Sequence, residues 1–158
     1  MPTTSRSLSA LARAHCMLLD TEWQGASLDA LVGNAVQAYL TDHPKAIETE
    51  GEAIALTPGH SVAISMVLHE LGTNAAQYGA LSHSDGRLRV ACRRAEDTAG
   101  PRLELSWQEW GGFEIAPPKE LGFGSRLIEQ AVSYQFGGSV EMDYSAKGLT
   151  CRISFPLK

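Results

Sequence analysis

The hydrophobic period of the chain changes near residue 80, and this change limits the folds that the chain can adopt. Over residues 58–80, apolar side chains recur at helical spacing, which predicts one long amphipathic helix. The residues of this stripe are Ile64, Val67, Leu68, Leu71, Ala75 and Tyr78. Thr57 and Pro58 indicate a helix start, because a capping hydroxyl precedes a proline at the first helical position. After residue 80, residues 86–94 and 103–107 alternate between apolar and polar, as strands with one buried face do.

Other patterns predict further helices and strands on both sides of these elements. The expected helices cover 8–19, Ser27 to Pro44, and 122–136. The expected strands cover 46–50, 53–56, 139–144 and 149–155, with a turn at Gly51 between the first two. The polar segment 95–101 is expected to be a hairpin loop. This order predicts an α+β fold, with helices packed on one face of a mixed, mostly antiparallel sheet, and disfavours a doubly wound βαβ array.

Composition excludes several classes of protein. The 158 residues suffice for one domain, and the net charge of −5 makes a general nucleic-acid binder a poor fit. The sequence contains no run of eighteen apolar residues, so it predicts no membrane span. The first residues lack the pattern of a secretory signal. The three cysteines, Cys16, Cys92 and Cys151, are far apart and odd in number, which argues against a disulfide framework or a zinc site and fits a reducing cytoplasm.

The first cluster of chemically active residues lies on the long predicted helix. Glu70 and Asn74 are four residues apart, so they share one face of the helix, offset from the apolar stripe. An amide oxygen beside a carboxylate suits a hard cation that is also bound by phosphate oxygens and water. The alternative is an exposed polar face with a hydrogen bond between the two side chains.

Two further clusters combine glycines with a carboxylate or with a helix start. Glu109 precedes Gly111 at a strand end, where a carboxylate can accept from an exocyclic amine while the backbone stays close to a flat ring. Gly122 and Gly124 precede a predicted helix, whose N-terminal N–H groups can bind phosphate. The alternatives are a glycine turn at a strand end and a flexible helix cap.

The order and spacing of the three clusters resemble the ATP-binding domain of sensor histidine kinases, in the GHKL group shared with DNA gyrase. Within that group the chain is similar to the HWE family, whose marks are a His in the N box and a Trp-x-Glu in the next box. Here these marks are His69 in "HELGTNAAQYGALS", and Trp107 with Glu109 in "WQEWGG". The resemblance covers residues 8–157 and implies the two-layer α/β sandwich of the Bergerat fold.

The resemblance implies roles for single residues. Asn74 matches the residue that coordinates the Mg²⁺ bridging the phosphates of ATP, and Glu70 matches the general base of the hydrolytic relatives. Tyr78 matches an aromatic residue that lies against the adenine, and Glu109 matches the acid that accepts the adenine amino group. Gln77 stands where the family usually has a phosphate-facing Lys.

The remaining matches concern glycines and the two aromatic family marks. The glycines that match positions bordering the nucleotide are Gly111, Gly122 and Gly124. Trp107 lies within a predicted strand and is interpreted as a core residue, and His69 is interpreted as a packed structural histidine.

The resemblance also implies an organisation and a function. Residues 1–24 are similar to the end of a second dimerisation helix, and residues 25–158 to the ATP-binding catalytic domain. The implied protein is a bacterial two-component histidine kinase in the cytoplasm, which presents the γ-phosphate of Mg-ATP to a phosphoacceptor histidine outside this chain. Its implied partners are the dimerisation and phosphoacceptor domain of the same kinase and a response regulator. The alternative is a degenerate GHKL module, a docking or phosphotransfer adaptor without ATP turnover, which Gln77 favours.

Overall fold

Five strands form one mixed sheet in the computed structural model, which describes residues 27–42, 45–111, 126, 129–145 and 148–157. The strands are β1 (Ile47–Gly51), β2 (Arg87–Asp97), β3 (Gly100–Trp110), β4 (Ser139–Ser145) and β5 (Gly148–Pro156). Their order across the sheet is β1-β2-β3-β5-β4, with β1 parallel to β2 and all other neighbours antiparallel. The predicted mixed, mostly antiparallel sheet is therefore confirmed.

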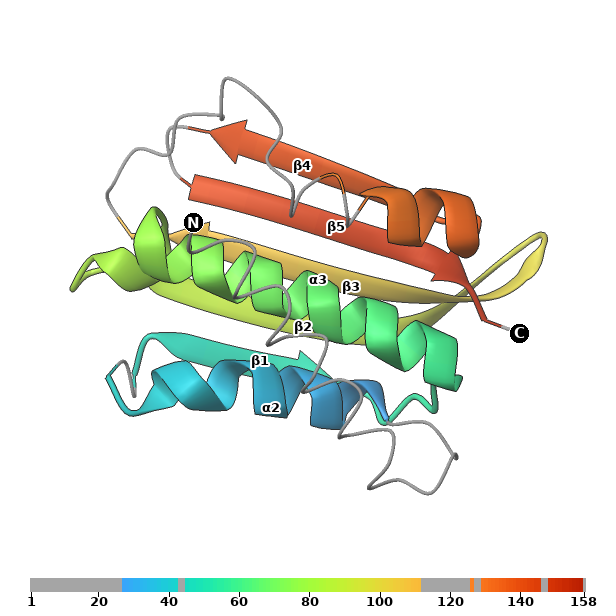
Figure 1. Cartoon of the computed structure of the whole chain (residues 1–158), viewed down its shortest axis with the longest axis horizontal. Helices are drawn as coiled ribbons and strands as arrows, with labels where there is room; N and C mark the ends of the chain where they lie inside the picture. Colours follow the sequence, from blue (N-terminus) through green and yellow to red (C-terminus); the bar gives the residue numbers. More distant parts are fainter. Residues whose placement is uncertain (1–26, 43–44, 112–125, 127–128, 146–147, 158) are drawn as a thin grey trace.

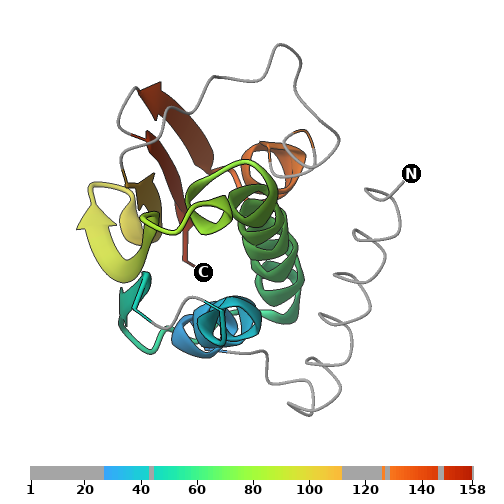
Figure 2. The same cartoon turned by 90° about the vertical axis from the view of Figure 1, so that its left-hand side faces the viewer.

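The helices lie on one face of this sheet, as the α+β pattern predicts (Figures 1 and 2). They are α2 (Leu28–Leu40), α3 (Pro58–Gln77), a 3₁₀ turn η1 (Ala80–Ser82) and a π-helical turn η2 (Gln130–Gln135). The expected helix over 8–19 lies outside the described residues. None of the helices in the described ranges is long and apolar enough to cross a membrane.

The long helix α3 begins where the sequence predicts. Thr57 is its N-cap and accepts a hydrogen bond from the backbone N–H of His60 at 3.2 Å, with Pro58 at the first helical position. The helix ends at Gln77, a few residues before the expected end, and Tyr78 is its C-cap. With β1 and β2 it forms one parallel β-α-β unit that the sequence patterns did not indicate.

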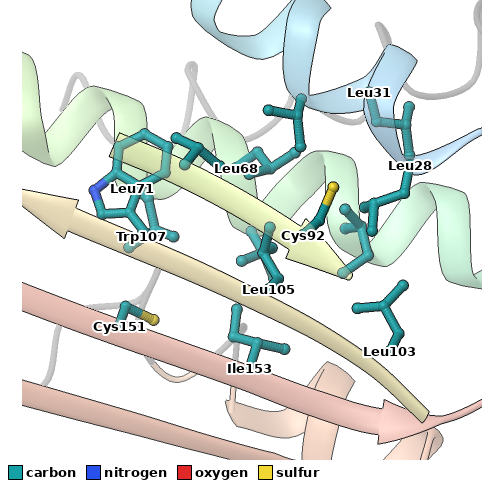
Figure 3. Packing of buried hydrophobic residues seen from close by; sticks show 14 of the residues in the cluster. Leu28, Leu31, Leu68, Leu71, Cys92, Leu103, Leu105, Trp107, Cys151 and Ile153 are labelled. Atoms are coloured by element: carbon teal, nitrogen blue, oxygen red, sulfur yellow. The ribbon is translucent and has the colours of Figure 1, made fainter. Parts of the chain in front are cut away.

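The core lies between the apolar face of α3 and the inner face of the sheet. Figure 3 shows side chains of β2, β3 and β5 pointing from the sheet towards the helices. The predicted inner face of β2 is confirmed, since Leu88, Val90 and Cys92 are all buried. Trp107 and Phe155 are the largest fully buried side chains among the described residues.

Two expectations about local structure are wrong. Residues 53–56 are not a strand but a connection with one isolated bridge from Ala55 to Ser27; Ile54 and Leu56 are buried, which gives the segment its strand-like alternation. Gly51 is not at a turn but is the last residue of β1. The expected helix over 122–136 is helical where the structure describes it: residues 126 and 129 are α-helical, and η2 is a π-helical turn.

The hairpin between β2 and β3 is confirmed, but its loop is shorter than the expected segment 95–101. The two strands pair as far as Asp97 and Gly100, so only two residues remain in the turn. Arg94 and Glu96 continue the inner face beyond Cys92 and are exposed. Because no apolar residue is needed there, the alternation that marks a half-buried strand disappears although the pairing continues.

We expect Thr57→Ala to lower the free energy of unfolding by about 1 kcal/mol, because the substitution removes the N-cap of α3. Urea denaturation checks this value. Thr57→Ser keeps the capping hydroxyl and serves as the matched control, with a smaller loss expected. Equal stability of Thr57→Ala and the parent protein would show that the cap does not stabilise the fold.

Candidate functional site

A buried carboxylate joins the end of α3 to the sheet. Glu109 lies near the end of β3 and is only 3% exposed. Its Oε1 accepts a hydrogen bond from the backbone N–H of Ala80 at 2.9 Å, and its Oε2 accepts one from the indole Nε1 of Trp107, also at 2.9 Å. The carboxylate plane is therefore fixed at both oxygens by donors from two different elements.

Burial and hydrogen bonding act on the ionisation of Glu109 in opposite directions. Burial raises the pKa of this carboxyl, and the N–H groups of Ala80 and Trp107 lower it, with burial the larger effect. Desolvation is the main cause of the raised pKa of Tyr144 and of Cys151, whose pKa is about 12. The negative charge of Glu109 adds to both shifts. The strand register is consistent with this: Tyr144 pairs with Leu149, the partner of Glu109 on β5, and Cys151 is two residues further along β5 on the same face.

The chain after α3 lies directly against the carboxylate. A Cβ at Gly79 would be 2.1 Å from Glu109 Oε1 and 3.0 Å from the Cα of Ala75, so only glycine fits without displacing neighbours. Gly111, two residues after Glu109, has a φ of +138°, and a Cβ there would be 2.4 Å from the carbonyl oxygen of Asp85. Close backbone approach therefore explains both glycines at this end of the sheet.

The structure places the predicted residues of the long helix at the same end of α3. Asn74 and Gln77 are exposed in its last turn, and Glu70 is half-buried one turn earlier. Tyr78 is 74% exposed at the C-cap, directly before Gly79. Glu109 is brought to this helix end through its bond to Ala80. Gly122 and Gly124 lie outside the described residues.

Sequence reasoning missed the link between Trp107 and Glu109. The interpretation of Trp107 as a core residue agrees with its 1% exposure, but its N–H also donates to Glu109. The signal that could have revealed it was the spacing, because residues i and i+2 of a strand share a face. A buried indole N–H also usually requires an acceptor. His69 is half-buried on α3, and its role stays an interpretation.

A groove of about 750 Å³ lies elsewhere, on the open face of the sheet. Small residues, among them Ala91 and Ser106, form its floor, and arginines and glutamates surround them. Arg93 and Glu104 form one of the exposed ion pairs along it, at 2.6 Å. Pairs of this kind are typical of a solvated sheet face, and Glu109 is not among the residues that line the groove.

Comparisons with known proteins agree with the resemblance found in the sequence. A family model described as "HWE histidine kinase" matches residues 3–53. A blue-light-activated histidine kinase of Brucella ovis is 29% identical over 153 residues, which cover 97% of this chain and 31% of that protein. Blue-light-activated histidine kinase 1 of Erythrobacter litoralis is 33% identical over 158 residues, covering 97% of this chain and 42% of that protein. The chain thus spans less than half the length of these relatives.

Solved structures show the same fold. The histidine kinase domain of the blue-light-activated kinase EL346 from Erythrobacter litoralis has a TM-score of 0.72 at 23% identity, covering 96% of this chain and 75% of that one. The catalytic domain of the histidine kinase ThkA has a TM-score of 0.62 at 15% identity, covering 82% of this chain and 91% of that one. The fold is that of a histidine kinase catalytic domain. The predicted resemblance to the HWE histidine kinases is therefore confirmed.

We expect Gly79→Ala to destabilise the protein by about 1–3 kcal/mol, because the new methyl group must displace the Glu109 carboxylate or the end of α3. Gly33→Ala is the matched control. Gly33 lies within α2, and a Cβ there would have no neighbour within 4 Å, so a gain of about 0.5–1 kcal/mol is expected. Urea denaturation of both variants tests the contrast. Similar effects at the two positions would contradict the close contact at Gly79.

Proposed function

We propose that this chain binds Mg-ATP at the end of α3 and presents the γ-phosphate to a histidine supplied by another part of the kinase. The observation that carries this proposal is the Glu109 carboxylate, buried and fixed beneath the helix end that bears Asn74 and Tyr78. A single test addresses it directly: the thermal stability of the chain with Mg²⁺ and a non-hydrolysable ATP analogue. A ligand at one hundred times its dissociation constant adds about 2.7 kcal/mol of apparent stability.

The proposed base-recognition role of Glu109 follows from the chemistry of its oxygens. Each oxygen accepts one N–H from the protein and retains capacity for another donor, such as the exocyclic amino group of adenine. Guanine has a carbonyl oxygen at the corresponding position, which a carboxylate repels. Tyr78 is well exposed beside this site, and its ring is proposed to lie against the base.

The polar face of α3 fits the phosphate end of the same ligand. Asn74 is exposed and supplies an amide oxygen, which is a suitable ligand for Mg²⁺ when phosphate oxygens and water complete the coordination. When bound, ATP would supply the phosphoryl group, and Mg²⁺ would supply positive charge that neutralises the phosphates. Glu70, one turn before Asn74, is proposed to accept or orient a proton of the phosphoacceptor. Most of the rate enhancement then comes from positioning and electrostatics.

The names of the relatives suggest which partners this module works with. The proteins from Brucella ovis and Erythrobacter litoralis are both named histidine kinases, so we propose that this module works with a dimerisation and phosphoacceptor domain and with a response regulator. We also propose a cytoplasmic location, which the free thiols of Cys92 and Cys151 suit. The comparisons give no support to the alternative of an adaptor module without ATP turnover.

We expect Asn74→Ala to abolish Mg²⁺-dependent binding of an ATP analogue without loss of stability. Asn74 is exposed on a helix, so alanine leaves no cavity and has the higher helix propensity. Titration calorimetry with and without Mg²⁺ measures binding, and urea denaturation measures stability. Asn34→Ala, at an exposed position of α2, is the matched control and should bind as the parent does. Unchanged binding by Asn74→Ala would contradict its role.

We expect Gln77→Lys to tighten binding of the Mg-ATP analogue several-fold at low salt. A charge about 4 Å from a phosphate is worth roughly 1–4 kcal/mol before desolvation and side-chain entropy, and a net gain of about 1 kcal/mol is several-fold in affinity. The gain should shrink with added salt, because position 77 is exposed.

The control for this charge is Gln37→Lys, an exposed position that adds the same charge on the neighbouring helix α2. Calorimetric titrations at two salt concentrations compare the two variants with the parent. Equal affinities of Gln77→Lys and Gln37→Lys at low salt would show that residue 77 does not face the phosphates.

A further inference from the structure

Trp107 contacts the proposed base-recognition residue rather than only filling the core. Its side chain points to the helix side of the sheet (Figure 3). Glu109, two residues later on β3, shares that face. The Trp107 indole is 1% exposed, and its Nε1 lies 2.9 Å from Glu109 Oε2. The acceptor of this buried donor is therefore a carboxylate, with which hydrogen bonds are shorter and stronger than with neutral groups.

The two donors to Glu109 have different origins. The N–H of Ala80 belongs to the backbone, and every residue except proline would supply it at that position. The N–H of Trp107 belongs to a side chain, and among buried apolar side chains of similar size only tryptophan carries such a donor. Packing requires a large apolar ring at position 107 but no N–H, so the indole donor supplies something that core filling does not require.

We propose that Trp107 is a positioning residue for nucleotide recognition, whose indole N–H fixes the orientation in which the Glu109 carboxylate meets the base. The inference rests on the proposed function of Glu109. With the Trp107 bond removed, Oε2 can turn about the remaining bond at Oε1, and the second acceptor position no longer has a fixed direction. Discrimination between adenine and guanine then falls, because it depends on where the carboxylate oxygen lies.

The surroundings of Glu109 support this assignment. Cys151 and Tyr144 lie on the same face of the sheet, on β5 and β4, and burial raises the pKa of each side chain. Neither of these two neighbours supplies a positive charge, so the ionised carboxylate is stabilised by its two N–H donors. Removal of one donor should therefore raise the pKa of Glu109 further.

The test compares the affinities of Mg-bound non-hydrolysable ATP and GTP analogues for the parent and for Trp107→Phe. We expect the adenine preference of the variant to fall by about tenfold, since a hydrogen bond to a charged group is commonly worth that factor or more. Leu105→Ala is the matched control: it opens a cavity on the same strand and the same face, and it leaves both bonds to Glu109 in place. The control should keep the adenine preference of the parent while losing stability.

A second variant separates the N–H from the shape of the ring. A benzothienyl analogue of tryptophan at position 107 keeps the bicyclic ring and replaces the N–H with sulfur, so it remains informative if Trp107→Phe fails to fold. We expect the same loss of adenine preference. Carboxyl-carbon NMR of the nucleotide-free protein provides an independent measurement, in which the pKa of Glu109 should be higher in the variant than in the parent, because one hydrogen bond to the ionised carboxylate is lost.

The outcomes distinguish failure of the proposed nucleotide binding from failure of the proposed role of Trp107. A parent protein that binds neither analogue would overturn the proposed function and the inference that rests on it. A parent that prefers adenine, together with variants that keep both its preference and the pKa of Glu109, would overturn the role of Trp107 alone.

Discussion

The structure depends on one buried carboxylate that receives hydrogen bonds from a helix end and from its own strand. Glu109 costs free energy to bury, and the N–H groups of Ala80 and Trp107 offset that cost in the ionised state. Its place between these donors fixes the end of α3 relative to β3. Gly79 is part of the same arrangement, because a side chain there would occupy the space of the carboxylate oxygen. The proposed nucleotide site is built around this contact.

The long helix α3 connects the core to that site. Its apolar face packs on the inner face of the sheet, with Leu68 and Leu71 almost fully buried, and its polar face remains accessible at Asn74 and Gln77. Thr57 caps the start of the helix and Tyr78 its end, and these two termini lie towards opposite ends of the same face of the sheet (Figure 1). A ligand at the C-terminal end therefore meets residues from α3 and β3 that the core has already positioned, which reduces the entropy lost on binding.

Local sequence patterns were sufficient to predict most of the helices and strands. They did not predict the contacts between residues that are distant in the sequence. The burial of Leu88, Val90 and Cys92 followed from alternation, and the start of α3 followed from Thr57 and Pro58. The parallel pairing of β1 with β2 was missed, because alternation does not report strand direction. The bond from Ala80 to Glu109 joins residues 29 apart, and no local periodicity indicates such a partner. Residue type and spacing singled out Asn74 and Glu109, the family resemblance added Tyr78, and the assembly of the three at one helix end became visible only in three dimensions.

The most direct measurement is a crystal structure of this chain with Mg²⁺ and a non-hydrolysable ATP analogue. We predict that the amino group of adenine lies within hydrogen-bond distance of the Glu109 carboxylate, which keeps its bonds to Ala80 and Trp107. We also predict that the amide oxygen of Asn74 coordinates the cation. A base bound away from Glu109, or a Glu109 carboxylate that leaves both donors when the nucleotide binds, would contradict the central claim.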